Sequence, residues 1–328
     1  MAAKDDRGWS VRGWWSGRNW AAVARRWPVF LIVVLLLVGF LVLSGGRVFL
    51  RPEDQGLQPE PTIKVRDEAT GEIKEMGLET YIMGVVAGEM DPHWPVEALG
   101  AQAIIARTFT LKKVFEGGGF ERFIASTDET KLQAYAPENI TPNVREAVRR
   151  TRGVVATHMG RVIRTWFHSC SGGQTSTPEE GLNFDAEPTP YIKSVKDPFP
   201  CGDKDTWQAT FSSEEIAAAA RPFGLHIEQV RSMEIVARGP SGRVVTLSIN
   251  GRRVNAADFR VQLDPRRMRS TLLTELKVRD GQVFMAGRGF GHGVGMSQFG
   301  AKALAEQGKT AAEIINYYFA NIKLEKRW

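Results

Sequence analysis

The feature that most constrains this chain is an uninterrupted apolar run near its N-terminus. Residues 29–43 (VFLIVVLLLVGFLVL) carry no charged or polar side chain. With Trp27 and Pro28 before it and Ser44 after it, the stretch reaches the roughly 17–25 residues that a spanning helix needs. The run therefore predicts one transmembrane helix at residues 29–44, followed by a large domain on the far side of the membrane.

The residues that flank this run indicate its orientation. Six basic and two acidic side chains precede it, and Trp14, Trp15, Trp20 and Trp27 suit a membrane interface. Positive flanks stay in the cytoplasm, so residues 1–28 are predicted to be a cytoplasmic basic tail. A cleaved signal peptide is the alternative, but the basic region is long and no A-x-A-like site follows. A buried core helix is a third reading, which a run that is apolar all round also permits.

The charge balance excludes one class of partner. The formal net charge is +6, but residues 1–44 hold six basic and two acidic groups and so account for +4. The rest of the chain has 37 basic and 35 acidic groups and is close to neutral. Nucleic-acid binding domains are strongly basic, so the outer domain is not predicted to bind nucleic acid.

The remaining pattern predicts an α+β fold with an inserted β-rich lobe. Residues 45–61 are rich in Gly, Pro and charge and read as a linker. The core is predicted to comprise residues 62–204 and 279–328, and the lobe residues 205–278. Periodicity predicts helices at 78–90, 96–116, 143–151, 214–220, 296–306 and 311–319, and strands at 63–65, 72–76, 154–157, 162–167, 232–236, 244–249, 251–254 and 282–286.

One carboxyl stands at a place suited to acid chemistry. Glu89 lies at the end of an apolar helix, just before an Asp-Pro break. A carboxyl at such a rim is partly desolvated, which raises its pKa. A raised pKa is what a general acid needs at neutral pH. The alternative is an ordinary exposed Glu near a helix end.

Arg107 interrupts the next helix among Ala, Ile, Thr and Phe residues. A charge on an apolar face is costly unless it is paired. Two readings follow: a structural ion pair with Glu89 or another acid, or a group that binds a substrate anion.

Residues 166–176 (WFHSCSGGQTS) place several polar side chains at a Gly-Gly turn. This is either a ligand-binding turn, with His168, Ser169 and Gln174 as contacts, or a polar turn around a buried Cys170. No second Cys/His pair completes a zinc set nearby, so no metal site is predicted. Cys170 and Cys201 could pair in an oxidising compartment, but the sequence leaves this open.

Residues 287–301 (GRGFGHGVGMSQFGA) hold five glycines between 287 and 295. This density predicts a backbone that approaches a ligand closely, just before a helix with free N–H groups. His292, Ser297 and Gln298 are candidate polar contacts. A phosphate loop is excluded because no Lys-Ser/Thr follows in register.

Together these segments resemble the SpoIID/LytB family along nearly the whole outer domain. The residues that carry the resemblance are Tyr81 to Leu111 with Glu89-Met90, Gln133-Ala134-Tyr135, His168-Ser169 with Gly173-Gln174-Thr175, and Gly287 to Ala301. The last motif is highly specific. The N-terminal apolar run and the inserted lobe are similar to the sporulation branch of the family.

The resemblance implies a membrane-bound lytic transglycosylase of peptidoglycan that acts in engulfment during sporulation. Glu89 matches the catalytic glutamate, which protonates the glycosidic oxygen and gives 1,6-anhydro-muramoyl ends. Arg107, Gln133 and Tyr135 join the substrate-contacting positions. The implied partners are stem-peptide-free glycan strands and a cell-wall amidase, and no cofactor is implied. Some members carry a metal loop with cysteines and a histidine, but residues 126–132 (STDETKL) have neither, so no zinc is expected there.

Two non-enzymatic hypotheses remain beside the enzyme. In the first, the outer domain binds glycan and activates an amidase, as the LytB name suggests, and Glu89 is structural. In the second, the chain is a scaffold that holds wall-remodelling partners at the membrane.

Overall fold

A computed structural model describes residues 59–328. The predicted basic tail, the predicted apolar helix and residues 45–58 of the linker lie outside this range. Across residues 59–328, no helix is both long enough and apolar enough to cross a membrane.

Two helices form the centre of the core, α3 (Leu78–Glu89) and α4 (Val96–Glu116). Apolar side chains at helical spacing, such as Leu78, Ile82 and Val85, are completely buried in α3. Pro95 precedes the first residue of α4, and Gly117 ends it, as the sequence signals predict. The other core helices are α5 (Pro142–Arg150), α6 (Pro178–Leu182), α9 (Gln298–Glu306) and α10 (Ala311–Tyr318).

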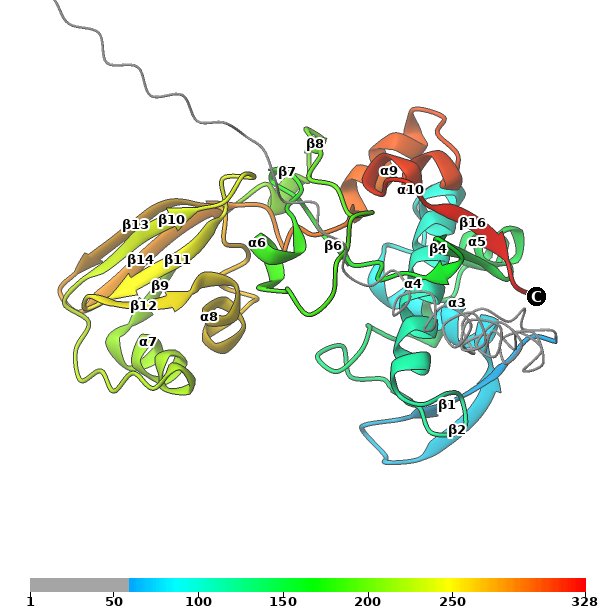
Figure 1. Ribbon diagram of the computed structural model, residues 1–328, viewed down its shortest axis with the longest axis horizontal. Coiled ribbons are helices and arrows are strands. Elements are labelled where there is room, and N and C mark those ends of the chain that lie inside the picture. The colour runs from blue at the N-terminus through cyan, green and yellow to red at the C-terminus, as the bar shows by residue number, and fades with distance from the viewer. Residues whose placement is uncertain (1–58) are drawn as a thin grey trace, which may run out of the picture. The chain divides into compact units, whose positions relative to one another are not determined.

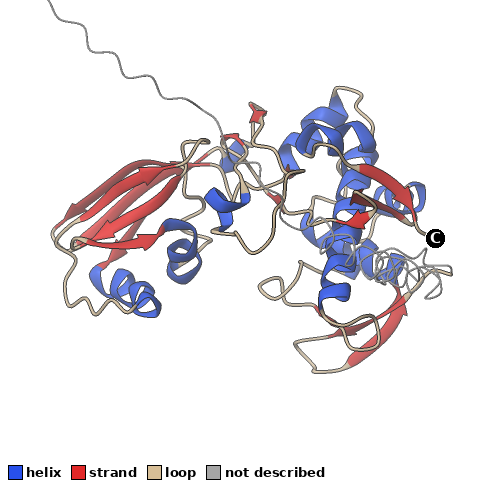
Figure 2. Ribbon diagram, in the orientation of Figure 1, coloured by secondary structure: helices blue, strands red, loops and turns tan. Residues whose placement is uncertain are grey.

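Small sheets surround these helices (Figures 1 and 2). One has the order β2-β1-β3, in which β1 (Thr62–Arg66) pairs antiparallel with β2 (Ile73–Gly77) and parallel with β3 (Ile124–Ser126). Another has the order β16-β4-β5, formed by Lys323–Lys326, Val154–His158 and Arg161–Val162. The two-stranded pairs join β6 (Phe167–His168) to β15 (Met296–Ser297) and β7 (Gly173–Gln174) to β8 (Lys196–Asp197).

The lobe has a hydrophobic cluster of its own, which runs from Trp207 to Met285. Its two sheets have the orders β13-β14-β9 and β10-β11-β12. Figure 1 shows α7 and α8 on the same side of these strands. The members are β9 (Thr206–Ser212), α7 (Ser213–Ala220), β10 (Met233–Arg238), β11 (Val244–Ile249), β12 (Arg252–Asn255), α8 (Ala256–Leu263), β13 (Leu273–Arg279) and β14 (Gln282–Arg288).

The lobe boundary at residue 278 differs from the one in the sequence prediction. Strand β14 was assigned to the core, but it is the middle strand between β13 and β9. Its buried side chains Val283 and Met285 belong to the cluster of the lobe. A local sequence pattern cannot reveal this, because β14 pairs with a strand about 75 residues away.

Most predicted elements are confirmed, including the strands at 63–65 and 72–76 and both central helices. The predicted strand at 162–167 is instead two short strands, β5 and β6. The predicted helix at 296–306 begins at Gln298, because Met296 and Ser297 pair with β6. Elements without a sequence prediction include α6, α8, β9, β13 and β16.

Candidate active site

Glu89 is the last residue of α3. The helix ends there because Met90 is extended, with φ −125° and ψ 159°, and Asp91-Pro92 follows. The C-terminal end of a helix carries partial negative charge, which disfavours a carboxylate at this position. The position alone therefore favours the protonated form of Glu89.

Two glycines on one face of α3 bring a second segment to Glu89. A Cβ on Gly88 would lie 2.8 Å from the backbone of Ala134, and a Cβ on Gly84 would lie 2.3 Å from the ring of Tyr135. Without these Cβ atoms, the segment 133–135 packs directly on the helix. The N–H of Ala134 then donates a 2.7 Å hydrogen bond to Oε1 of Glu89.

Burial raises the pKa of the Glu89 carboxyl from 4.5 to about 7. Hydrogen bonds from the Ala134 N–H and from the Gln298 side chain act in the opposite direction, because they favour the carboxylate. Both forms of the carboxyl are therefore populated near neutral pH. A group of this kind can donate a proton and take one back.

This pKa predicts a pH-dependent cost in stability. The unfolded chain titrates near 4.5 and the folded chain near 7, so the folded state binds the extra proton between these values. Stability is then lost as the pH rises through this window, by ~3 kcal/mol in total. We expect the stability of Glu89→Gln relative to the wild type to rise by about that amount between pH 4 and pH 8, measured by urea unfolding. A constant difference across this range would contradict the raised pKa.

The second and third sequence segments pack against each other. Strand β15 pairs in parallel with β6, which places Ser297 beside His168 and Met296 beside Phe167. Glycines of the loop make room for this contact: a Cβ on Gly295 would lie 2.0 Å from the Trp166 carbonyl oxygen, and one on Gly291 would lie 2.8 Å from the His168 Cβ. The loop glycines were predicted to approach a ligand. In the structure these two approach protein backbone and side chain.

His168 and His292 lie beside each other, with ring centroids 5.7 Å apart. Nδ1 of His168 is 3.2 Å from the Val294 carbonyl, and Nδ1 of His292 accepts a 3.0 Å hydrogen bond from the Val294 N–H. Burial lowers the pKa of His168 well below 6.5 and that of His292 to about 3, so both rings are neutral. Through these hydrogen bonds with Val294, the two histidines hold the glycine loop.

Arg243 of the lobe binds the turn that follows β6. Its guanidinium is completely buried and donates to the carbonyls of Ser171 (2.7 Å) and Gln174 (3.0 Å). Burial lowers its pKa to about 10, so it stays charged at neutral pH. Gln174 also donates from its side chain to Ser194 (3.1 Å), and the Ser169 carbonyl accepts from the Phe299 N–H (3.1 Å).

Three further candidates hold the elements that carry Glu89 and Gln298. Gln133 is buried and donates to the Thr110 hydroxyl at 2.9 Å. Tyr135 stacks on Tyr81, with ring centroids 5.5 Å apart. Ser297 is the N-cap of α9 and accepts from the Gly300 N–H at 3.2 Å. Within residues 59–328, Gln298 is the only predicted site residue whose side chain contacts the Glu89 carboxyl. For the other predicted site residues, contact with a substrate stays a prediction.

Arg107 pairs with Glu79 and not with Glu89. Its Nε and Nη2 donate to the two carboxylate oxygens of Glu79 at 3.0 and 2.6 Å, and the side chain is completely buried. Of the two sequence readings, the structure supports the ion pair with another acid. A guanidinium enclosed in this way offers no donor to a ligand, so the proposed substrate contact of Arg107 is corrected.

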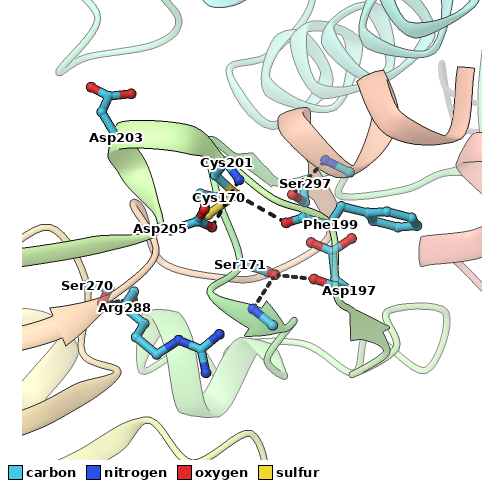
Figure 3. The surroundings of a disulfide bond; sticks show 12 residues. Cys170, Ser171, Asp197, Phe199, Cys201, Asp203, Asp205, Ser270, Arg288 and Ser297 are labelled. Atoms are coloured by element: carbon cyan, nitrogen blue, oxygen red, sulfur yellow. Dashed lines mark hydrogen bonds between the residues drawn. A yellow bond between two sulfur atoms is a disulfide. The ribbon is translucent and has the colours of Figure 1, made fainter. Parts of the chain in front are cut away.

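Cys170 and Cys201 form a disulfide, which the sequence left open (Figure 3). These two residues and Asp205 lie close enough together to resemble a metal-binding group. However, the disulfide removes both thiolates, so the group does not fit a thiolate metal site. The loop at 126–132 is held by hydrogen bonds and by a 2.9 Å ion pair between Lys131 and Glu68. It offers no thiolate or imidazole for zinc.

Two aromatic residues close in sequence to Glu89 and Gln298 were not among the predicted site residues. Trp94, in the loop after Glu89, meets Phe299 edge-on with ring centroids 5.0 Å apart. Phe299 directly follows Gln298, and both rings are partly exposed. The Trp in DPHWP was a usable signal, since an aromatic ring in a loop next to a candidate acid is a common wall of a ligand site.

Two family profiles match parts of this chain. A profile of the stage II sporulation protein family, SpoIID, matches residues 66–158, and a domain of unknown function, DUF8618, matches residues 202–295. The stage II sporulation protein D of Bacillus amyloliquefaciens is 30% identical over 91% of this chain and 92% of its own length. That of Bacillus subtilis is 30% identical over 85% of this chain and 84% of its own.

A more distant relative carries a different name. The amidase enhancer of Bacillus subtilis is 25% identical over 74% of this chain, which corresponds to 40% of its own length. The profile match covers the helix that ends at Glu89, and the similarity to the two D proteins extends over most of the chain. This chain therefore belongs to the SpoIID family of stage II sporulation proteins.

Proposed function

We propose that this protein is a membrane-anchored lytic transglycosylase that cleaves the glycan strands of peptidoglycan during engulfment in sporulation. The observation that carries the proposal is Glu89, a carboxyl with a pKa near 7 at the end of α3, which accepts hydrogen bonds from the Ala134 N–H and the Gln298 side chain. The family membership supplies the substrate class.

The proposed reaction needs one carboxyl. Protonated Glu89 gives its proton to the glycosidic oxygen between N-acetylmuramic acid and N-acetylglucosamine, and the bond to the muramoyl C1 breaks. The C6 hydroxyl of the same muramoyl residue attacks C1 and loses its proton to the Glu89 carboxylate. The product is a 1,6-anhydro-muramoyl end, no water is consumed, and Glu89 returns to its starting form.

The surroundings of Glu89 support a mechanism with a single carboxyl. Ordinary glycosidases use two carboxyl groups about 5–10 Å apart. Among the described residues, the acid that most affects Glu89 electrostatically is Glu129, which forms a 2.6 Å ion pair with Arg266. An ion-paired carboxylate at the surface is poorly suited to act as a nucleophile.

Digestion of peptide-free glycan strands by the full-length chain tests the proposal. Mass spectrometry should detect 1,6-anhydro-muramoyl ends. Reducing ends would indicate a hydrolase, and intact strands would contradict an enzyme of this kind.

The pKa of Glu89 also predicts how this activity depends on pH. The first step needs the protonated acid, and its population falls about tenfold per pH unit above the pKa. We expect kcat/KM for peptide-free strands to decline from about pH 7 upward. A profile that stays flat to pH 9 would exclude Glu89 as the proton donor.

The membrane anchor is part of the proposal and rests on the sequence alone. The apolar run at 29–44 would hold the chain in the cell membrane, with its N-terminus in the cytoplasm and residues 59–328 outside. Protease added to intact protoplasts should then remove the outer domain and leave the basic tail protected.

A second candidate function follows from the similarity to the amidase enhancer. Here the outer domain would bind glycan and stimulate a cell-wall amidase without cleaving glycosidic bonds. Glu89→Gln separates the two functions. If the chain only activates an amidase, the variant should stimulate the amidase as well as the wild type does, and neither the wild type nor the variant should form anhydro ends.

A further inference from the structure

Lys204 lies near the rings of Phe290 and Phe299, and Phe299 directly follows Gln298 of the candidate site. The amine of Lys204 lies 5.2 Å from the ring centre of Phe299 and 5.9 Å from that of Phe290. All three side chains are partly exposed. No carboxylate within residues 59–328 lies within the 4.0 Å of an ion pair from this amine. Its positive charge is therefore available to a ligand.

The position of Lys204 is fixed by the disulfide. Lys204 ends the short turn Gly202–Lys204, which begins directly after Cys201. Cys201 is bonded to Cys170, two residues after His168, and its N–H donates to the Asp205 carboxylate at 2.9 Å. The turn is thus tied to the strand that pairs with the start of α9, where Gln298 meets Glu89.

Further positive charge continues from Lys204 into the lobe. The guanidinium of Arg269 lies 5.6 Å from the ring centre of Phe290. Arg269 and Arg288 line a hollow of about 680 Å³ that also includes Thr206, Gln208 and Thr274. Asp203 is the one acid on this wall, and its backbone oxygen accepts from Arg269 at 3.0 Å.

The order of these groups suits an anionic sugar chain. Ring faces can cover the apolar face of a pyranose, and cations beside them can bind a carboxylate. In a peptide-free strand, every muramoyl residue has a free lactyl carboxylate. Where a stem peptide is attached, this group is an amide and has no charge.

We propose that Lys204 binds the lactyl carboxylate of a muramoyl residue, and that Phe290 and Phe299 hold the sugar beside it. This inference rests on the proposed function, since it takes peptidoglycan as the substrate. It assigns to one side chain the preference for strands without stem peptides, which the reaction at Glu89 does not itself require.

The test compares two substrates, peptide-free strands and the same strands with their carboxylates converted to amides. A charge-assisted contact predicts that wild-type full-length protein prefers the carboxylate form about tenfold in kcat/KM. For Lys204→Gln the ratio should fall close to one, whereas Lys204→Arg should keep most of it. The control is Lys309→Gln, which removes the same charge at an exposed pair with Glu313, and should retain the full ratio.

Equal ratios for Lys204→Gln and Lys309→Gln would overturn the inference, as would a wild-type protein that does not discriminate. Unfolding midpoints of the variants show whether they are folded. If no protein cleaves either substrate, the proposed function fails. In that case, the affinities of fluorescent carboxylate and amide strands are compared by equilibrium binding. A preference for the carboxylate form that Lys204→Gln removes supports the inference, and a preference that it leaves unchanged overturns it.

Discussion

Replacing Glu89, the proposed general acid, by Gln should lower the proposed formation of 1,6-anhydro ends about a thousandfold, the middle of the range for loss of a general acid. Gln keeps the size of the side chain and can still accept the hydrogen bond from the Ala134 N–H. It cannot give a proton to the leaving oxygen or take one from the C6 hydroxyl. Single-turnover digestion of peptide-free strands, followed by mass spectrometry of the ends, measures the loss directly.

Glu129→Gln is the matched control for this experiment. Glu129 is the nearby acid that raises the pKa of Glu89, although less than burial does. Its removal should change the rate by less than about threefold, because a surface pair such as Glu129–Arg266 contributes little. A loss as large as that of Glu89→Gln would mean that two carboxyls take part, and the products should then be reducing ends.

Replacing Arg107 by Met should destabilise the folded part of the chain by about 3–5 kcal/mol, because it leaves the Glu79 carboxylate buried without its counter-charge. Glu79 is 5% exposed and also accepts from the Gly153 N–H and from Nε1 of Trp328, both at 2.9 Å. The pair therefore joins the start of α3 to α4, to the turn before β4 and to the C-terminal residue. The denaturant midpoint at constant m-value measures the effect.

Two comparisons identify the cause of this loss. Arg107→Met combined with Glu79→Leu should recover part of the stability, because no unpaired charge remains. Arg149→Met breaks an exposed pair with Glu146 and should cost less than about 1 kcal/mol. The substrate reading of Arg107 would regain support if Arg107→Met kept its midpoint but bound glycan strands less tightly.

The two central helices and the place of Glu89 were predictable because their signals are local. Apolar spacing marks α3, and the Asp-Pro pair marks its end, which places Glu89 at the last residue of the helix. The sequence left open whether this carboxyl is buried, because that depends on Ala134 and Gln298, which come from distant segments. The partner of Arg107 was not predictable in this way. Glu79 is 28 residues away along the chain, and the sequence states only that a buried guanidinium needs some acid.

The glycine loop shows a second limit. A backbone that touches a ligand and a backbone that touches another strand both require the absence of Cβ, so the two cases look alike in sequence. In this protein Gly291 and Gly295 meet β6 and the residue before it. Likewise, Lys204, Phe290 and Phe299 come from separate segments, and neither their spacing nor their type shows that they meet.

The disulfide between Cys170 and Cys201 bears on when the turn at 202–204 becomes fixed. Such bonds persist where thiols are oxidised and are rare in the cytosol. A newly made chain that still faces the cytosol would lack the tie between β6 and the turn at 202–204. If the chain is exported and binds carboxylated strands as proposed, this binding surface would be completed only after export.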